Sequence, residues 1–485
     1  MNEITLNWNE YTEAAIKTAA EGIVMLENKD NVLPLKKGSR IALFGRMQTH
    51  YYKSGTGSGG MVNVNHVSDI REGLNECPDI TLDAELMDIY DKWDEENPID
   101  AGLGWGKEAW SQAEMPVSEE LAGTLASRND IAVIIIARTA GEDRDNSAEK
   151  GAYFLSDSEE GMLENVTKAF DKTIVLLNVG NIIDMSFVTK YNIKGVLYIW
   201  QAGMIGGISV ARVMSGKVNP SGCLPDTIAR SLEDYASDAY FCKDLKEDIY
   251  HDDIFVGYRY FSTFANDVVL YPFGAGLSYT EFELNDSEFK FEDDVVTVSV
   301  TVKNIGSVPG KKAVMVYCKA PDGALSKPSR VLIGFAKTGN IPAGEEERVT
   351  ITAPVRRFAS FDDDCRTVAD ERTGNGHYLL GLVRSQTEQS SNTVRIGKHF
   401  NNTAGRGNLD GSPHAQGHLI DQTDLINDGN LMVQSIANQH TIVTLDDGGS
   451  NLLAVRSAAV DQVGGYLEIH IPGDDYDVVL SPRGG

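Results

Sequence analysis

Four short apolar runs in the first half of the chain constrain the fold more than any other feature. They are IALFG at 41–45, IAVIIIA at 131–137, TIVLLNVG at 173–180 and GVLYIWQAG at 195–203. Runs without alternating polar residues are typical of strands buried on both faces, as in a parallel sheet covered by helices. The sequence therefore predicts a central sheet with helical layers.

The segments between these runs carry helix signals. Ser156 and Glu159 stand three residues apart before a periodic apolar stretch, which indicates a capping box at a helix start. A second helix is expected over 208–215, with Gly216 placed to end it. Apolar residues at three- and four-residue spacing predict an amphipathic helix over 13–27. Strands that alternate with helices of this length form βαβ units.

The second half of the chain has a different pattern. Short strand-like runs are separated there by Gly, Pro, Asp and Asn turns, which predicts an antiparallel β-sandwich. From His399 onward the chain contains no Lys or Cys and few aromatic residues. Aromatic burial supplies much of a core's stability, so this tail is expected to be a small β appendage or a partly disordered extension. The strand-like runs are 295–304, 313–320, 330–336, 348–355 and 377–383.

These patterns define the predicted architecture. The 485 residues are enough for about three domains at ~150 residues each. We predict an α/β fold, in which a layered α/β sandwich with a mostly parallel sheet is followed by an antiparallel β-sandwich and a short atypical tail. The predicted parts are a lead-in at 1–13, the α/β sandwich domain at 14–235, a connector at 236–283, the β-sandwich at 284–397 and the tail at 398–485.

Charge and composition exclude several classes of partner. The net charge of −28 repels phosphate backbones and anionic lipids, so neither nucleic acid nor a membrane surface is expected as a partner. The longest apolar run is far shorter than the ~18 residues of a membrane span. The N-terminus lacks the features of a secretory peptide, which predicts a cytoplasmic protein. Five scattered cysteines without a CxxC pair fit reduced thiols, and the dispersed histidines predict neither a metal site nor a cofactor.

A glycine cluster, KSGTGSGG at 53–60, is the first candidate site, and Gly55, Gly57 and Gly60 satisfy GxGxxG. A dinucleotide site needs such a loop to open a helix directly after a strand. Here the loop starts several residues past the 41–45 run, and no obvious helix follows. A flexible loop at the rim of another pocket is therefore favoured over nucleotide binding.

A polar run, ARTAGEDRDNSAEKG at 137–151, is the second candidate because it directly follows the most apolar strand. Ligands of open α/β sheets gather at the carboxyl ends of strands, and crowded acids raise the pKa of at least one carboxyl, as a proton donor requires. The alternative is a charged, solvated loop. Trp200 ends the last apolar run and is either a core residue or a sugar-stacking face. The charged residues of the run are Glu142, Asp143, Arg144, Asp145 and Glu149.

Several motifs together resemble family 3 glycoside hydrolases, most typically β-glucosidases. The resemblance covers about residues 12–397 and implies that family's α/β sandwich domain and its fibronectin type III-like domain. The motifs, in the family's order, are AAEGIVMLENKDNVLPL, IALFGRM, KSGTGSGG, ARTAGEDRD, VLLNVGN, WQAG, GKVNPSGCLPDT, FVGYRYF and YPFGAGLSYTEFE.

The resemblance implies a retaining mechanism and a role for one glutamate. The family's acid/base glutamate lies in a Ser/Ala-Gly-Glu-Gly-like motif, matched here by Ala140, Gly141 and Glu142, with Asp143 in place of the second glycine. Glu142 is therefore expected to protonate the leaving oxygen and then to deprotonate water. Small β-glucosides or oligosaccharides are the implied substrates. The residues predicted to bind them are Lys53, Ser54, Gly55, Arg138, Asp145 and Trp200.

The sequence departs from the family in one respect. The family's nucleophilic aspartate lies in a (β/α)8 barrel, which takes ~250 residues, and no stretch of this sequence resembles one. We therefore expect this chain to carry the acid/base half of the site without the nucleophile. The alternative is a non-catalytic carbohydrate-binding or interaction protein. The face that would pack on a barrel is expected to favour self-association.

Overall fold

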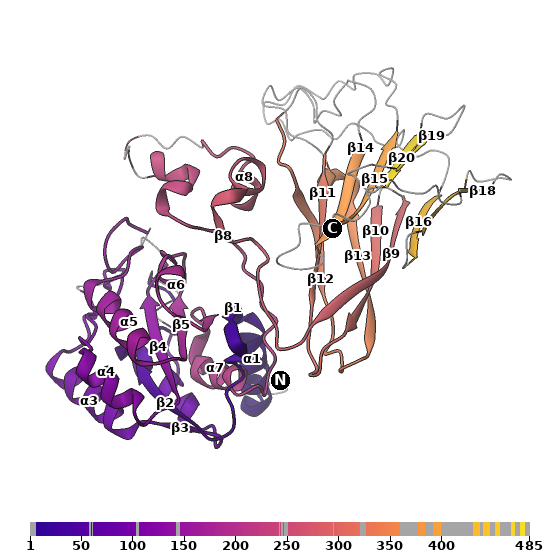
Figure 1. Ribbon diagram of the computed structural model, residues 1–485. Coiled ribbons are helices and arrows are strands. Elements are labelled where there is room, and N and C mark those ends of the chain that lie inside the picture. The colour runs from indigo at the N-terminus through magenta and orange to yellow at the C-terminus, as the bar shows by residue number, and fades with distance from the viewer. Residues whose placement is uncertain are drawn as a thin grey trace, which may run out of the picture. The chain divides into compact units, whose positions relative to one another are not determined.

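The computed structural model (Figure 1) describes the greater part of the first three quarters of the chain and separate strands beyond it. By contacts, the chain divides into two compact units: unit 1 is Met1–Ala239 with Val268–Tyr279, and unit 2 is Tyr240–Asp267 with Thr280–Gly485. The connector predicted at 236–283 is thus divided between the units. The described residues are 6–57, 60, 62–102, 106–141, 146–241, 243, 246, 251–293, 295–320, 326–358, 377–383, 391–398, 430–436, 440–446, 452–455, 467–470 and 476–480.

Unit 1 is built on a six-stranded sheet with the order β1-β6-β5-β4-β2-β3. All neighbouring strands in it are parallel except β1, which pairs antiparallel with β6. The predicted layered α/β fold is confirmed. The strands are β1 (Val24–Asn28), β2 (Ser39–Phe44), β3 (Ile80–Leu82), β4 (Ile131–Arg138), β5 (Thr173–Val179), β6 (Gly195–Tyr198) and a separate pair, β7 (Ile228–Ala229) and β8 (Val269–Tyr271).

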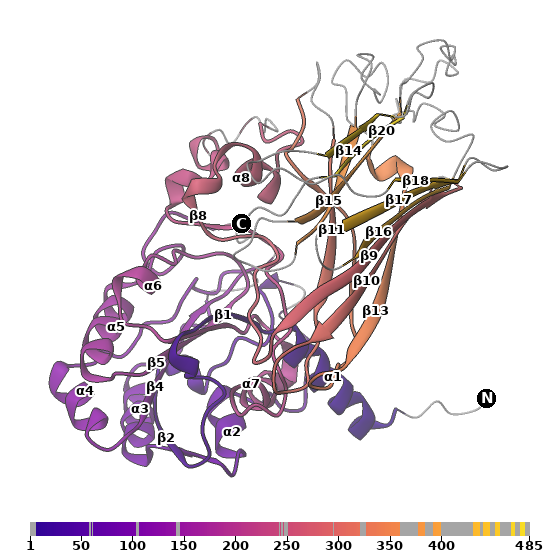
Figure 2. The same ribbon diagram turned by 45° about the vertical axis from the view of Figure 1, so that its right-hand side comes forward.

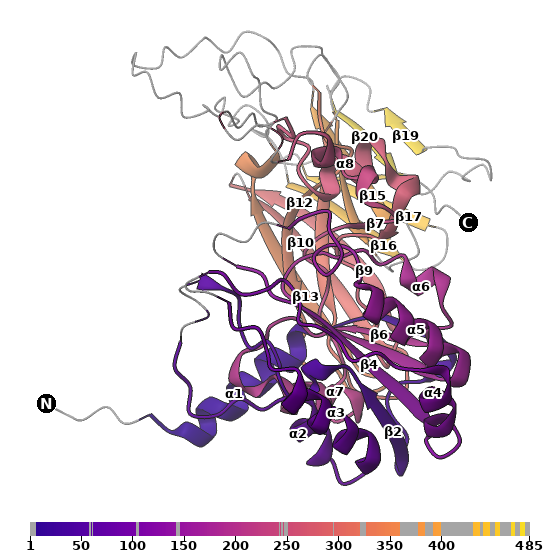
Figure 3. The same cartoon turned by 90° about the vertical axis from the view of Figure 1, so that its left-hand side faces the viewer.

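Helices cover both faces of this sheet, as Figure 3 shows for β2, β4 and β6. Successive strand side chains point to opposite faces, and the apolar ones fall into two clusters. One cluster joins the sheet to α3, α4, α5 and α6, and the other joins it to α1, α2 and α7. The helices are α1 (Trp8–Gly22), α2 (Ile70–Asn75), α3 (Ala84–Glu96), α4 (Glu119–Ala126), α5 (Asp157–Ala169), α6 (Phe187–Lys190) and α7 (Gly206–Met214).

Two helix predictions are confirmed and one is wrong in its extent. Ser156 and Glu159 form the predicted capping box at the start of α5. Helix α7 ends at Met214, and Gly216 shortly after it has a φ of 76°, a conformation that favours glycine. The helix predicted over 13–27 stops at Gly22. The residues after it form β1, because their backbone groups pair with β6 at the sheet edge.

Part of the chain returns to unit 1 after residue 267. Leu277 N–H donates to the Met25 carbonyl oxygen at 2.7 Å, and the Tyr271 hydroxyl donates to the Glu27 carboxylate at 2.7 Å. The Leu224 N–H also donates to the Ala275 carbonyl oxygen at 2.7 Å. The segment 268–279 is therefore a structural part of unit 1.

Unit 2 contains two antiparallel six-stranded sheets, with the orders β13-β10-β9-β16-β17-β18 and β12-β11-β14-β15-β20-β19 (Figure 2). The predicted β-sandwich is confirmed, and the tail contributes strands to both sheets. Among the described residues, no helix of the chain is long and apolar enough to cross a membrane. The elements are α8 (Tyr258–Phe264), β9 (Phe282–Glu292), β10 (Val295–Asn304), β11 (Ala313–Lys319), β12 (Val331–Lys337), β13 (Glu346–Pro354), β14 (His377–Val383), β15 (Ser391–Lys398), β16 (Asn430–Ile436), β17 (His440–Asp446), β18 (Leu452–Val455), β19 (Leu467–His470) and β20 (Tyr476–Leu480).

Candidate active site

The candidate site lies at the edge of the unit 1 sheet where the parallel strands end. The chain leaves β2 at Phe44, β4 at Arg138, β5 at Val179 and β6 at Tyr198. Because these strands are parallel, the four following loops meet at one edge, which is where open α/β sheets bind ligands. The described parts of both candidate segments, 53–57 and 60 in the first and 137–141 and 146–151 in the second, belong to this edge.

The glycine loop is docked on the backbone that directly precedes Glu142. Thr56 N–H donates to the Ala140 carbonyl oxygen at 2.8 Å, and Thr56 forms a parallel β-bridge with Gly141. A Cβ atom at Gly55 would lie 2.2 Å from the Ala140 oxygen, and one at Gly141 would lie 2.6 Å from the Thr56 nitrogen. Gly141 also has a φ of 148°. This contact therefore requires glycine on both sides.

The predicted catalytic residue itself, Glu142, and the predicted substrate-binding residue Asp145 lie outside the described residues, as do Asp143 and Arg144. The chain is described again from Asn146, whose side-chain amide donates to the Ile182 carbonyl oxygen at 2.8 Å. The loop that holds Glu142 is therefore attached to the sheet edge at both its ends.

Lys53 and Ser54 are held within the glycine loop. The Lys53 ammonium donates to Ser54 Oγ at 3.3 Å and to the carbonyl oxygens of Gly60 and Val62 at 3.2 and 3.3 Å. The Lys53 carbonyl oxygen accepts from Gly203 N–H at 2.8 Å, which joins this loop to the one after β6. Substrate binding by Lys53, Ser54 and Gly55 stays a prediction. The next helix, α2, begins only at Ile70, so this loop does not open a helix as a dinucleotide site requires.

Asn178 joins two of these loops by hydrogen bonds, and it is not among the residues predicted from the sequence. Its side chain is fully buried at the end of β5. Its Oδ1 accepts from Tyr52 N–H at 2.8 Å, and its Nδ2 donates to the carbonyl oxygens of Tyr52 and Trp200 at 3.0 and 2.6 Å. A polar residue that interrupts the apolar run TIVLLNVG is the signal that could have indicated this role.

Arg138 is buried beneath the site and hydrogen bonded to protein atoms. Its guanidinium donates to both carboxylate oxygens of Glu159, at 2.7 and 2.8 Å, and to the Ala152 carbonyl oxygen at 2.8 Å. Arg138 is 0% exposed and Glu159 is 5% exposed. The predicted contact of Arg138 with substrate stays a prediction. What the structure describes is a bidentate ion pair that fixes the loop between β4 and α5.

A buried carboxyl, Glu114, contacts the backbone that follows β2. Glu114 accepts from the backbone N–H groups of Arg46 and Met115 at 3.0 and 2.8 Å, while the Arg46 guanidinium bonds elsewhere, to Asp94 at 2.8 Å. Burial is the main cause that raises the pKa of Glu114 to about 8. Asp94 also contacts His50 Nε2 at 3.0 Å. No sequence pattern indicates this cluster, because its members are far apart along the chain.

Trp200 is half-buried beside the core. Its indole N–H donates to the Gly22 carbonyl oxygen at 2.9 Å, and its ring lies 4.2 Å from that of Tyr198, centroid to centroid. Its φ is 54°, which is unusual for a large residue and indicates a conformation fixed by its surroundings. These contacts support the core interpretation of Trp200. Sugar stacking by its remaining face stays a prediction. In the part of the chain that the structure describes, no cluster of side chains could hold a metal ion.

Comparison with known proteins agrees with this geometry. Residues 23–279 match the Glycosyl hydrolase family 3 C-terminal domain, and residues 312–375 match the Fibronectin type III-like domain. The first match includes every strand and loop of the candidate site. The second includes β11, β12 and β13.

The sequence is similar to those of bacterial β-glucosidases. It is 50% identical over 395 residues to a β-glucosidase of Ruminococcus albus, a match that covers 81% of this chain and 41% of that protein. It is 36% identical over 437 residues to β-glucosidase A of Butyrivibrio fibrisolvens, covering 81% of this chain and 52% of that protein. The chain thus spans about half the length of these curated relatives.

Solved structures give the same result. A β-glucosidase of Paenibacillus barengoltzii matches with a TM-score of 0.75 and 36% identity, over 90% of this chain and 49% of that one. β-Glucosidase 3B of Thermotoga neapolitana, solved in complex with glucose, matches with a TM-score of 0.71 and 33% identity, over 82% of this chain and 55% of that one. The order of the strands, the loops at their carboxyl ends and these matches together show that the chain belongs to glycosyl hydrolase family 3.

Proposed function

We propose that this chain carries the acid/base part of a retaining β-glucosidase, with Glu142 as the acid/base. The observation that best supports the proposal is the contact of the glycine loop with Ala140 and Gly141, because it fixes the backbone next to Glu142 at the ligand-binding edge of the sheet. The proposed substrate class, β-glucosides, comes from the β-glucosidases to which the chain is similar.

Glu142 would act twice in each turnover. It first donates its proton to the glycosidic oxygen, while a carboxylate on the other side of the sugar attacks the anomeric carbon and forms a covalent glycosyl intermediate. It then takes a proton from water, which hydrolyses that intermediate. Retention requires the two carboxyl groups to be ~5–5.5 Å apart. We propose that the nucleophile belongs to a domain other than the two described here.

The other predicted residues would hold the terminal glucosyl unit. Lys53, Ser54 and Gly55 offer an ammonium, a hydroxyl and backbone amides, which can bind sugar hydroxyls, and Asp145 can accept from them. Arg138 would contribute through the loop that it fixes, since its guanidinium is already hydrogen bonded to protein atoms. Small β-glucosides and oligosaccharides are the proposed substrates.

The test compares Glu142→Gln with Glu149→Gln in the purified chain. Glu149 is an exposed acid on the same loop, so the pair matches the change in charge. Without a nucleophile we expect turnover of aryl β-glucosides far below that of a complete enzyme. The residual turnover should fall in Glu142→Gln and stay unchanged in Glu149→Gln.

Substrates with different leaving groups make this test more specific for the acid/base role. Protonation matters most for a poor leaving group, so the loss in Glu142→Gln should be larger with methyl β-glucoside than with 2,4-dinitrophenyl β-glucoside. Equal losses on both substrates, or none, would remove Glu142 from the acid/base role. Rapid turnover by the wild-type chain alone would show that it contains its own nucleophile.

A second candidate function is carbohydrate binding without catalysis. The observation that favours it is that Lys53 and Ser54, whose side chains are of types that bind sugar hydroxyls, are held together in the glycine loop at this edge of the sheet. Calorimetric titration with glucose and cellobiose separates the two functions. Saturable binding of both sugars without any turnover sensitive to Glu142→Gln would support the binding protein.

A further inference from the structure

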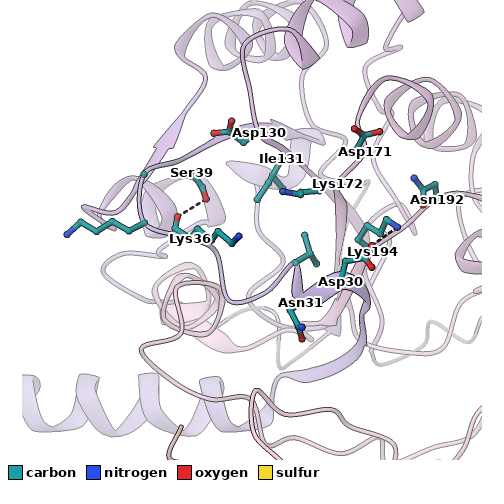
Figure 4. A pocket seen from close by; sticks show the side chains of 13 residues that line it. Asp30, Asn31, Lys36, Ser39, Asp130, Ile131, Asp171, Lys172, Asn192 and Lys194 are labelled. Carbon is teal, nitrogen blue, oxygen red and sulfur yellow. Dashed lines mark hydrogen bonds and ion pairs between the residues drawn. The ribbon is translucent and has the colours of Figure 1, made fainter. Parts of the chain in front are cut away.

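A pocket of about 550 Å³ opens at the amino-terminal edge of the unit 1 sheet, the edge opposite to the candidate active site (Figure 4). It is lined by residues that begin or directly precede parallel strands: Ser39 of β2, Asp130 before β4, Lys172 before β5 and Lys194 before β6. Parallel register brings these positions together for the same reason that it brings the catalytic loops together at the other edge.

Most of the charges around this pocket are already paired. Lys194 forms an ion pair with Asp30 at 2.8 Å, and Lys37 forms one with Asp79 at 3.1 Å. The third acid, Asp130, accepts from the Arg40 guanidinium at 3.1 and 3.3 Å and from its backbone N–H at 2.9 Å. Within each pair the positive and the negative charge offset each other, so these six side chains add little net charge to the pocket.

Lys36 and Lys172 have no such direct partner, although the charge of Lys172 adds to that of Arg40 in lowering the pKa of the Asp130 carboxyl. Figure 4 shows the ammonium groups of Lys36 and Lys172 extending from two sides toward the middle of the pocket. Among the described residues, neither ammonium has a hydrogen bond or an ion pair. The carboxylate of Asp171 points away from both of them in the same view. The middle of the pocket is therefore a positively charged position in a chain of net charge −28.

We propose that this pocket binds a small polar ligand through a phosphate group held between Lys36 and Lys172. Lysine ammonium groups are common phosphate ligands that act as point charges. The negative charge of the whole chain does not prevent this, because interactions between exposed charges are screened beyond ~8 Å at physiological salt. The ligand would be bound there without being hydrolysed by Glu142, whose loop belongs to the other edge.

The remaining lining indicates what the phosphate is attached to. The volume is typical of small-molecule sites, which run from ~300 to 1,000 Å³, and exceeds what one phosphate needs. Asn31 and Asn192 offer amide groups that can bind hydroxyls, and none of the lining residues is aromatic. A sugar phosphate fits this lining better than a nucleotide, since a base would find no ring to stack on.

The test is calorimetric titration of the full chain with inorganic phosphate and with glucose 6-phosphate. We expect saturable binding at millimolar or lower concentration that weakens as salt is added. Lys36→Met and Lys172→Met should each weaken it by about tenfold or more. Tighter binding of glucose 6-phosphate than of phosphate identifies a sugar phosphate, and equal binding identifies free phosphate as the ligand.

The control is Lys168→Met, which makes the same change of charge outside the pocket and should leave binding unaltered. Lys172 follows the C-terminus of α5, where a lysine also stabilises a helix end. Thermal unfolding of each variant shows that it is folded under the conditions of the titration. Absence of saturable binding to the wild-type chain, or equal binding by Lys36→Met, Lys172→Met and Lys168→Met, would overturn the proposal.

Discussion

Arg138 shows how a single buried charge supports the candidate site. Its guanidinium and the Glu159 carboxylate are both excluded from solvent and satisfy each other with two hydrogen bonds. Glu159 also accepts from the Ser156 N–H at 2.8 Å, so the same carboxylate caps α5. The ion pair therefore connects the end of β4 with the start of α5.

Arg138→Met is expected to lower the free energy of unfolding by ~3–5 kcal/mol, because it leaves the Glu159 carboxylate buried without a counter-ion. Urea denaturation measures the change. Lys168→Met removes a lysine from an exposed pair with Glu164 on the same helix and should have no measurable effect. Similar stability of the two variants would show that Arg138 is not the counter-ion on which this loop depends.

The raised pKa of Glu114 leads us to predict that the free energy of unfolding depends on pH. Its pKa is raised from 4.5 to about 8, mainly by burial. The folded chain therefore binds more protons than the unfolded chain between these values, and Glu114 lowers the free energy of unfolding as pH rises through this range, by at most ~1.4 kcal/mol per pH unit. Above pH 8 its unfavourable contribution is constant.

Glu114→Gln removes this ionisation, while its amide oxygen can still accept from Arg46 and Met115. We expect the difference in unfolding free energy, variant minus wild type, to increase from pH 5 to pH 8 and then to level off. Denaturation curves at several pH values measure it, with the exposed Glu95→Gln as the matched variant. A difference that does not change with pH would contradict the burial of an ionisable carboxyl.

At the scale of elements, the contact between the glycine loop and the end of β4 leaves no room for a side chain. A methyl group at Gly55 would collide with the Ala140 carbonyl oxygen, which is backbone and cannot move away by changing a rotamer. We expect Gly55→Ala to shift the loop that precedes Glu142. Displacements of about 1 Å in a site cost up to ~10²-fold in rate.

Gly55→Ala should therefore weaken glucose binding, or lower turnover, by about tenfold or more while the chain stays folded. The matched variant is Gly123→Ala on α4, where nothing lies within 4 Å of the new methyl group. Alanine is favoured over glycine in helices by ~1 kcal/mol, so this control should be neutral or slightly stabilised. Calorimetry and thermal unfolding test both, and equal effects would mean that the loop contact does not position the site.

The elements also show what the sequence could predict. Strands such as β4 and β10 were found because their side chains repeat the burial pattern of a sheet, all buried in the first and alternate in the second. The boundary between α1 and β1 was missed because Ile23 and Val24 fit helical spacing as well as a strand. Pairing with β6, which is distant in sequence, decides it.

The candidate site was predicted less completely than the fold. The glycine cluster indicated one loop, the position of the polar run directly after the most apolar strand indicated the other, and the resemblance selected Glu142. It did not indicate Asn178 or Glu114, whose partners are separated from them by 126 and 68 residues. Such contacts exist only once the sheet has brought distant loops to one edge, so no local pattern encodes them.

At the scale of the whole molecule, net charge and exposed apolar side chains have opposite effects on association between copies of the chain. Leu6, Trp8 and Tyr11, at and before the start of α1, are 54%, 58% and 49% exposed, while the chain carries a charge of −28. Like charges keep copies apart at low salt, and salt screens that repulsion. Apolar surface then favours association.

We predict that the chain self-associates more strongly as salt concentration rises, and that Trp8→Gln combined with Tyr11→Gln reduces the association. Light scattering at low and high salt measures the mass. Thr18→Gln, on the exposed part of the same helix, is the matched control. A monomeric mass at every salt concentration would contradict the prediction.

The path of the chain between its two units has a practical consequence for work with fragments. The chain passes from one unit to the other after Ala239, Asp267 and Tyr279. One protease cut between the units cannot release either of them, and a gene fragment that stops at codon 239 would lose the hydrogen-bonding partners of Met25, Glu27 and Leu224. A fragment meant to isolate unit 1 should therefore extend through codon 279 and replace residues 240–267 with a short linker.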